Sequence, residues 1–286
     1  MSGDPKAMYS GMMRVRFFLI VIAYGFLYKG LTIAIRYSLL RKQFKDSQGK
    51  EIRIFDYQLQ KQKLFSELVK AHAMSSMAHF LRVIIWENQA RSMNGDFSLL
   101  QQTHLLLSCC KAMFTWWNTR AMLTLIQCCG GHGYSMYSGL PNIFMTSFPD
   151  TILEGENSVL ILQVSRSLVK AYQRIKMGET EDFSEDLRYL LEMDELEEFE
   201  LGGTEKDIRN FDDLVKTFQK VAAYHIGDTS LALYQKISEG MDPKAVRKRR
   251  IIKIKIWEIK SYFLFPFFQL FTNYSFRLGI ILPARN

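Results

Sequence analysis

The chain has 286 residues, of which 48% are hydrophobic and 23% are charged. This length and composition allow a large buried core, so we expect a globular protein and not a disordered chain. The formal net charge of +8 would suit an anionic partner such as a nucleic acid, a membrane surface or a phosphorylated cofactor. The charges gather in an acidic run at 178–200 and a basic run at 244–260, which we interpret as solvated surface. We predict no nucleic-acid partner.

Helical periodicity dominates the long segments, and proline is scarce, with 6 residues in the chain. We therefore predict an all-α fold without a convincing run of strands. The first expected helix, 9–40, contains an apolar segment at 17–28 that is bounded by Arg16 and Lys29. Because this segment falls short of the roughly 20 residues that a membrane span needs, a buried core helix is the better interpretation. Further helices are expected at 56–93, 99–129, 154–177 and 210–240.

Four long helices with short connections predict an antiparallel four-helix bundle. We assign this bundle to residues 1–178, an acidic linker to 179–206, and part of a second helical domain to 207–286. From about Lys253 the chain becomes a tail rich in Phe and Ile, without a clear period. The pattern predicts no structure for that tail.

The four cysteines form two adjacent pairs, Cys109-Cys110 and Cys128-Cys129. Neither pair has the two-residue gap of metal sites and redox motifs, so we predict reduced thiols and no metal site. His132 also lacks a second ligand at a suitable spacing, and we assign it no chemistry. The aromatic residues Phe114, Trp116 and Trp117 have helical spacing and are expected to be core, not a stacking platform.

The connection after the third helix, residues 130–156, is long for a compact domain, and loops of this length are usually functional or disordered. Its aromatic residues and few charges argue against disorder. Two motifs border it: Gly130, Gly131 and Gly133 at its start, and Glu-Gly-Glu-Asn, which begins at Glu154, at its end. A Gly-Gly-x-Gly motif alone is weak evidence, since no strand precedes it as a dinucleotide-binding fingerprint requires.

Three segments together carry a more specific signal. They are AIRYSLLRKQF at 34–44, QCCGGHGYSMYSGLPNIF at 127–144 and ILEGENSVLILQVSR at 152–166. In this order and spacing they resemble the acyl-CoA oxidases, and the resemblance extends over about residues 4–177. Proteins of that family have an N-terminal helical domain, a middle β-domain and two C-terminal helical domains, so this chain would begin after the first two.

The resemblance implies an enzyme that oxidises a fatty acyl-CoA to 2-trans-enoyl-CoA and passes the electrons to O2, giving H2O2 in peroxisomal β-oxidation. It implies FAD as the cofactor, bound at the interface of a homodimer, and a peroxisomal location. The C-terminal residues do not match the SKL type of peroxisomal signal.

Glu154 is the catalytic base that the resemblance implies. In the family this glutamate removes the pro-R α-proton of the substrate while the β-hydrogen leaves as hydride to the flavin, and its backbone N–H helps to polarise the thioester carbonyl. A carboxylate in an apolar site suits this role, because burial raises its pKa towards neutrality. The alternative is that Glu154 only complements the dipole of the following helix, with Asn157 or Ser158 as capping residues.

The same resemblance implies the other contacts. For the FAD diphosphate of a neighbouring subunit it points to side chains and glycine backbone at Arg41, Gln43, Gln127, Gly130 and Gly131. For the substrate it points to Gly155 and to Arg16, which would lie near the phosphates of CoA. For Arg16 surface solvation is an equal alternative, and Gln127 is more common in the related acyl-CoA dehydrogenases than in the oxidases.

Two other kinds of function stay open. One is a noncatalytic helical interaction protein that kept the bundle and lost the flavin. The other is a membrane-associating protein that uses the segment 17–28, the apolar tail and the basic residues 244–250, which we do not favour. A dehydrogenase would share the base with an oxidase, although the segment 130–144 resembles the oxidases more closely.

Overall fold

The computed structural model describes residues 5–181, 183–204 and 210–240. The chain divides into two compact units, residues 1–160 and 161–286, and each is described by itself. The all-α prediction is confirmed, with one small exception given below. The domain boundaries predicted at 178 and 206 stay predictions, and the basic run and the tail lie outside the described residues.

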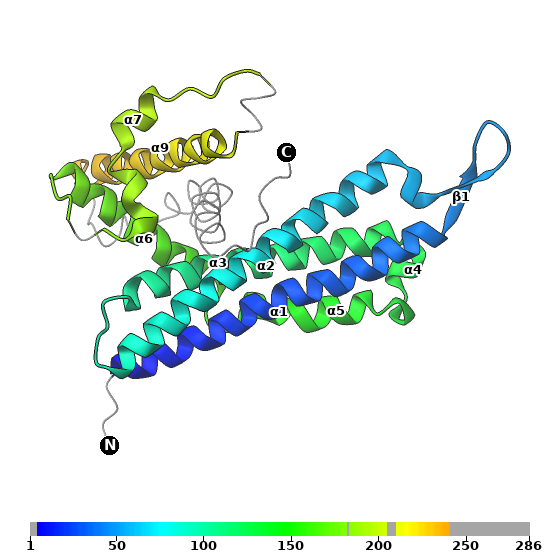
Figure 1. Cartoon of the computed structure of the whole chain (residues 1–286), viewed down its shortest axis with the longest axis horizontal. Coiled ribbons are helices and arrows are strands. Elements are labelled where there is room, and N and C mark those ends of the chain that lie inside the picture. Colours follow the sequence, from blue (N-terminus) through cyan, green and yellow to red (C-terminus); the bar gives the residue numbers. More distant parts are fainter. Residues whose placement is uncertain (1–4, 182, 205–209, 241–286) are drawn as a thin grey trace, which may run out of the picture. The chain divides into compact units, whose positions relative to one another are not determined.

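The first unit is built on three long helices, α1 (Pro5–Leu40), α2 (Gln58–Met93) and α3 (Leu100–Cys128). They pack side by side, and α2 runs antiparallel to the other two (Figure 1). Their facing side chains form the core, where Leu27, Leu81 and Leu107 are fully buried. At Gly30 an added Cβ would lie 2.6 Å from the Met122 sulfur. Glycine therefore lets α1 approach α3 closely.

By length and hydropathy alone, residues Gly11–Leu40 of α1 could cross a membrane. The helix buries Leu19, Ile20 and Ala23 against its neighbours, while 39% of its most apolar window is buried. Phe114 of α3 is fully buried as well and stacks on Trp117, with ring centroids 6.1 Å apart. Phe114 is therefore a core residue, as predicted, whereas Trp116 and Trp117 are only half-buried.

A two-stranded antiparallel hairpin joins α1 to α2, and the prediction of no strands is wrong here. Its strands are β1 (Lys42–Lys45) and β2 (Glu51–Arg53), followed by the short helix η1 (Ile54–Asp56). Asp46 closes the turn by accepting backbone hydrogen bonds from Gln48 and Lys50 at 2.9 Å. Strands of four and three exposed residues are too short to give an alternating hydrophobic pattern.

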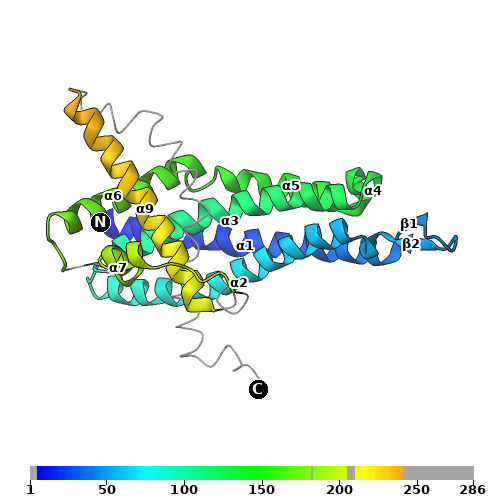
Figure 2. The ribbon, with the colours of Figure 1, turned by 90° about the horizontal axis from the view of Figure 1, so that it is seen from above.

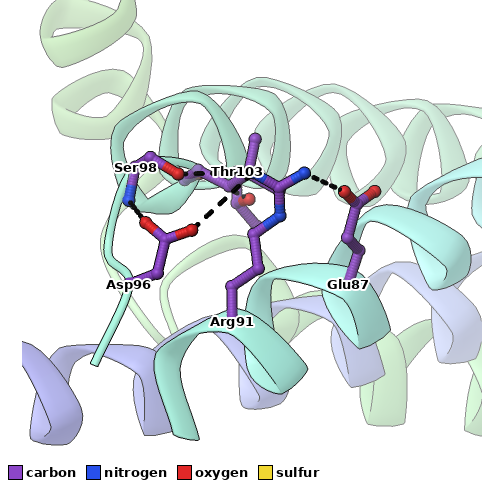
Figure 3. A network of polar contacts seen from close by, with 6 residues as sticks. Glu87, Arg91, Asp96, Ser98 and Thr103 are labelled. Atoms are coloured by element: carbon purple, nitrogen blue, oxygen red, sulfur yellow. Dashed lines mark hydrogen bonds and ion pairs between the residues drawn. The ribbon is translucent and has the colours of Figure 1, made fainter. Parts of the chain in front are cut away.

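At the other end of α2, a polar network holds the turn into α3 (Figure 3). Arg91 pairs with Glu87 at 2.6 Å on its own helix and with Asp96 at 3.8 Å across the turn. Asp96 also accepts the Ser98 backbone N–H at 2.9 Å, and these contacts with Ser98 and Arg91 lower the pKa of its carboxyl group. All of these groups are exposed, so the network fixes the geometry of the turn more than it stabilises the fold.

The segment predicted as a long loop, 130–156, is mostly helical. It contains α4 (Gly131–Tyr134), η2 (Met136–Ser138), α5 (Leu140–Ser147) and η3 (Phe148–Thr151) before α6 (Asn157–Lys176) begins. Pro141 starts α5 and Pro149 starts η3, as suits a residue whose φ is already helical. Helices of three to eight residues are too short for a 3.6-residue period to show.

In the second unit, α6 lies against α9 (Phe211–Ser238), and a side chain at Gly227 would press on Tyr172. The helix predicted at 210–240 is thus confirmed, and the Asn210 side chain caps it by accepting the Asp212 backbone N–H. The expected acidic linker carries two short helices, η4 (Glu185–Leu190) and α7 (Met193–Glu198), and α7 packs on α9.

Candidate functional site

The turn between η3 and α6 has an unusual backbone. Glu154 has a positive φ of 55°, a conformation that costs a non-glycine residue about 1–2 kcal/mol. Gly155 follows with φ 111°, and a Cβ there would lie 2.8 Å from the Leu160 side chain. Glycine is therefore required at 155, and Glu154 is held in a strained conformation directly before it.

A buried arginine holds the first carbonyl of the turn. The Arg16 side chain of α1 is only 5% exposed, and its Nε donates to the Glu154 carbonyl oxygen at 3.0 Å. Its Nη1 lies 2.9 Å from His104 Nδ1 and donates to Ser108 Oγ at 3.1 Å. The predicted contact of Arg16 with CoA phosphates stays a prediction; in this structure the guanidinium fixes the backbone of Glu154.

A buried lysine holds the next carbonyl. Lys111 of α3 has no exposed surface, and its Nζ donates to the Gly155 carbonyl oxygen at 2.8 Å and to Asn157 Oδ1 at 2.9 Å. Asn157 in turn donates to the Ala112 carbonyl at 3.1 Å and to Thr115 Oγ1 at 2.9 Å. Burial, aided by repulsion from Arg16, lowers the pKa of Lys111 to about 8. The start of α6 is thus tied to the middle of α3.

Three carboxylates surround these cations and differ in role. Glu156 caps α6, since its two oxygens accept the backbone N–H groups of Ser158 and Val159 at 2.9 and 3.2 Å. Asp150 is buried, which raises its pKa, and its Oδ2 has no hydrogen-bond partner among the described residues. The half-buried Glu154 carboxylate makes no hydrogen bond or ion pair with the part of the chain that the structure describes. The capping role that was expected of Asn157 or Ser158 is filled by Glu156.

The second feature is a cavity of about 510 Å³ where α1, the hairpin, α2 and the end of α3 meet. Both views place the hairpin and α4 at the same end of the first unit (Figures 1 and 2). The cavity brings together all five residues predicted to contact FAD, namely Arg41, Gln43, Gln127, Gly130 and Gly131. Whether they bind FAD stays a prediction.

The lining of the cavity is basic and presents open backbone. Arg41 and Lys63 contribute positive charge, and no acidic residue is among the lining residues. Side chains added at Gly130 or Gly131 would meet nothing within 4 Å, so the peptide groups there can be approached closely. Arg41 donates to Gln43 Oε1 at 2.9 Å, and His132 Nδ1 lies 3.0 Å from the Tyr37 hydroxyl. Such a surface suits an elongated anionic ligand with a diphosphate.

The two features lie far apart on one helix. Arg16 lies in α1 and Arg41 directly follows its last residue, 25 residues further on, which at 1.5 Å per helical residue is about 37 Å. This separation exceeds the length of an extended FAD molecule. A single flavin cofactor therefore cannot reach both the Glu154 turn and the cavity of the same chain.

The cysteines and possible metal ligands add no further chemistry. All four thiols are free and buried, and burial raises the pKa of Cys109 to about 12 and that of Cys129 to about 11. They are neutral thiols at neutral pH and poor nucleophiles. Within the described ranges, no three His, Cys, Asp or Glu side chains gather to form a metal site.

Sequence reasoning missed Lys111 and the inward role of Asn157. One signal was present: Lys111 stands alone in the otherwise uncharged helical stretch LLLSCCKAMF, 105–114. A charged residue on a buried helical face is rare unless its charge is used. The partners of Lys111, at 155 and 157, could not be read from that stretch.

The fold is similar to that of several solved acyl-CoA oxidases. Acyl-CoA oxidase 3 of Yarrowia lipolytica matches with a TM-score of 0.84 at 21% identity, covering 99% of this chain and 41% of that one. Acyl-CoA oxidase 1 of Arabidopsis thaliana matches with a TM-score of 0.82 at 24% identity, covering 98% and 41%. Acyl-CoA oxidase-2 of Caenorhabditis elegans, bound with FAD, ascaroside-CoA and ATP, gives 0.81 at 24%, covering 96% and 40%. The fold is thus that of the helical C-terminal region of these oxidases.

Sequence comparison identifies the family. Residues 9–169 match the model of the acyl-CoA oxidase C-alpha1 domain. Bovine peroxisomal acyl-coenzyme A oxidase 1 is 38% identical over 176 residues, which is 61% of this chain and 27% of that protein. Mouse peroxisomal acyl-coenzyme A oxidase 2 is 36% identical over 178 residues, 62% of this chain and 26% of that protein. The chain belongs to the acyl-CoA oxidase family, and it spans about a quarter of the length of these relatives.

Proposed function

We propose that this chain supplies the catalytic base and part of the FAD site of an acyl-CoA oxidase. The enzyme oxidises a fatty acyl-CoA to 2-trans-enoyl-CoA and reduces O2 to H2O2. The observation that carries the proposal is the Glu154 turn. An unpartnered, half-buried carboxylate stands on a strained backbone whose next two carbonyls are held by buried cations. A motif placed in this way suits a group that must meet a substrate in one fixed geometry.

The chemistry assigned to Glu154 is the removal of the α-proton. An α-C–H next to a thioester is a weak acid, so the base must be held close to it and shielded from water. Ile152 and Leu153 are exposed apolar residues beside Glu154, and a bound acyl chain would cover them. The Glu154 carboxylate takes the α-proton onto one of its oxygens, while its backbone N–H donates to the thioester oxygen.

The residues of the cavity fit FAD. A basic guanidinium at Arg41, the amides of Gln43 and Gln127, and the open peptide groups at Gly130 and Gly131 are the donors that a diphosphate requires. A flavin held there would supply the acceptor for the β-hydride and the route for the two electrons to O2.

The distance between the two features supports a homodimer. Since one cofactor cannot span about 37 Å, the cavity of one copy would hold the diphosphate of a flavin whose ring serves another copy. The resemblance assigns the remaining flavin and acyl contacts to a middle β-domain. The relatives are named peroxisomal oxidases, and we propose the same location for this protein.

The test is a flavin titration of the purified 286-residue chain, followed by octanoyl- or palmitoyl-CoA and a peroxide assay. Bound flavin that loses its absorbance with acyl-CoA and yields peroxide in the unmutated chain, but not in Glu154→Gln, supports the proposal. In a second arm, residues 4–177 of this chain replace the matching segment of the bovine oxidase. The bovine protein then supplies the other domains of the enzyme. An inactive chimaera that binds FAD and is correctly folded would contradict the proposal and favour a noncatalytic helical protein.

A further inference from the structure

Lys111 is the most buried charged residue of the site, and the chemistry described so far does not use it. It lies in the middle of α3, with no exposed surface. Its ammonium contacts two uncharged acceptors, the Gly155 carbonyl at 2.8 Å and the Asn157 side chain at 2.9 Å. A buried cation without a directly bonded carboxylate is costly. The fold bears this cost directly behind the Glu154 turn.

The position of the buried Lys111 ammonium indicates its role. Arg16 holds the carbonyl of residue 154, and Lys111 holds the carbonyl of residue 155. The two cations therefore fix the two successive peptide planes that follow Glu154. To relax from its positive φ of 55°, the turn would have to move at least one of these carbonyls and leave a buried cation without its acceptor.

Lys111 differs from Arg16 in reaching beyond the turn. Through Asn157 it also joins the first residue of α6, and Asn157 is anchored to α3 by hydrogen bonds to Ala112 and Thr115. Both the turn and the start of α6 are thus held by neighbouring residues of one rigid helix, α3. A side chain on such a frame keeps its direction better than one on a loop.

We propose that Lys111 is a positioning residue for Glu154, which holds the strained turn so that the carboxylate faces the substrate. This inference rests on the proposed role of Glu154 as the base. It predicts that Lys111 sets the geometry of the turn in the free chain, and that it sets the rate of proton removal without contributing to the binding of acyl-CoA.

The first arm of the test does not depend on activity. Amide hydrogen exchange is measured over residues 154–159 in the unmutated chain, in Lys111→Met and in Lys170→Met, a matched control at an exposed position of α6. We expect exchange at least about 10-fold faster in Lys111→Met and unchanged in the control. Exchange within about twofold of the unmutated chain, at equal helicity, would overturn the proposal.

Because Lys111→Met removes the centre of a buried hydrogen-bond network, a second measurement uses the unmutated chain. With 15N-labelled lysine, an ammonium held by two acceptors and excluded from water gives one Nζ–H signal that exchanges slowly at pH 6. Lys111→Arg, which keeps a cation at this place, must abolish that signal. The absence of any slowly exchanging lysine signal would also overturn the proposal.

The second arm uses flavin-loaded protein and octanoyl-CoA. In Lys111→Met the maximal rate of flavin reduction is expected to fall at least about 10-fold, while the Kd for octanoyl-CoA stays within about threefold, and Lys111→Arg should recover part of the rate. An unchanged rate with faster exchange would make Lys111 merely structural and overturn its positioning role. If the unmutated protein reduces no flavin, the proposed function fails, and the exchange arm then decides by itself whether Lys111 holds the turn.

Discussion

The Glu154 turn and the cavity near Gly130 use polar groups in opposite ways. At the turn, the buried side chains of Arg16, Lys111 and Asn157 all form hydrogen bonds with other groups of the chain. Around the cavity, Arg41 and Gln43 are exposed, and glycine peptide groups face open space. The cations and the amide behind the turn therefore have their partners within the chain, whereas the polar groups around the cavity are accessible to a ligand. Substitutions should accordingly affect stability at the first and binding at the second.

The largest loss of stability is expected at Asn157. Its replacement by Ala removes three buried hydrogen bonds and leaves Lys111 with one acceptor, which should cost about 3–4 kcal/mol of unfolding free energy. The exposed capping residue Asn210, replaced by Ala, should cost only about 1 kcal/mol. Urea unfolding of both variants checks this, and similar losses would remove the contrast between a buried network and a surface cap.

Two glycines at the edge of the cavity provide the next test. A Cβ at Gly133 would clash with the Ile126 backbone carbonyl, whereas one at Gly131 would meet nothing within 4 Å. We expect Gly133→Ala to cost about 2 kcal/mol or more, and Gly131→Ala to cost under about 0.5 kcal/mol. Gly131→Ala should still weaken the binding of FAD, because Gly131 lines the cavity and the added methyl group takes up space there. Thermal unfolding and a flavin titration measure the two effects.

The dependence of stability on pH should reveal the protonation of Lys111. Its folded pKa of about 8 lies below its ordinary value of 10.5, so the folded state releases this proton first and becomes more stable as pH rises from about 8 to 10.5. The charged groups that face it are Arg16, Asp150, Glu154 and Glu156.

The free energy of unfolding should therefore rise in the unmutated chain relative to Lys111→Met between pH 7.5 and 10.5. The comparison of the two chains cancels the thiols and phenols that also titrate there. Parallel curves for the two chains would mean that Lys111 is not perturbed. Lys170→Met is the control and should run parallel to the unmutated chain.

The smallest effect is expected at Arg41. Arg41→Gln should raise the Kd for FAD about 10-fold, which corresponds to about 1.4 kcal/mol of binding free energy. The fold should not change, because the side chain is exposed. Its neighbour Lys42 is exposed but does not line the cavity, so Lys42→Gln should change the Kd by less than about twofold. Equal effects would mean that net charge attracts the ligand without a specific contact.

The long helices could be predicted from the sequence, and the short elements could not. Helices such as 58–93 and 100–128 repeat their period many times, so both ends fell within two residues of the expected positions. The strands of the hairpin at 42–53 and the helices between 131 and 151 are too short to show a hydrophobic period. They form because the surrounding helices and residues such as Asp46 and Pro141 hold them.

The candidate site shows the same division. The cavity residues 41, 43, 127, 130 and 131 were assigned from family motifs, and the structure gathers them in one place. The Glu154 turn is supported by Arg16, which is 138 residues from Glu154, and by Lys111, which is 44 residues from Gly155. Such contacts depend on how three helices pack. No local pattern in the sequence encodes them, although the lone Lys111 in an uncharged stretch was a sign.

The most direct test of the account compares two glutamates of one motif in flavin-loaded protein. Glu154 stands free on the strained turn, while Glu156 caps α6. On addition of octanoyl-CoA, Glu156→Gln should reduce its flavin within about threefold of the unmutated rate, and Glu154→Gln should be slower by about 100-fold or more. Equal rates in the two variants, or a normal rate in Glu154→Gln, would contradict the claim that Glu154 is the base.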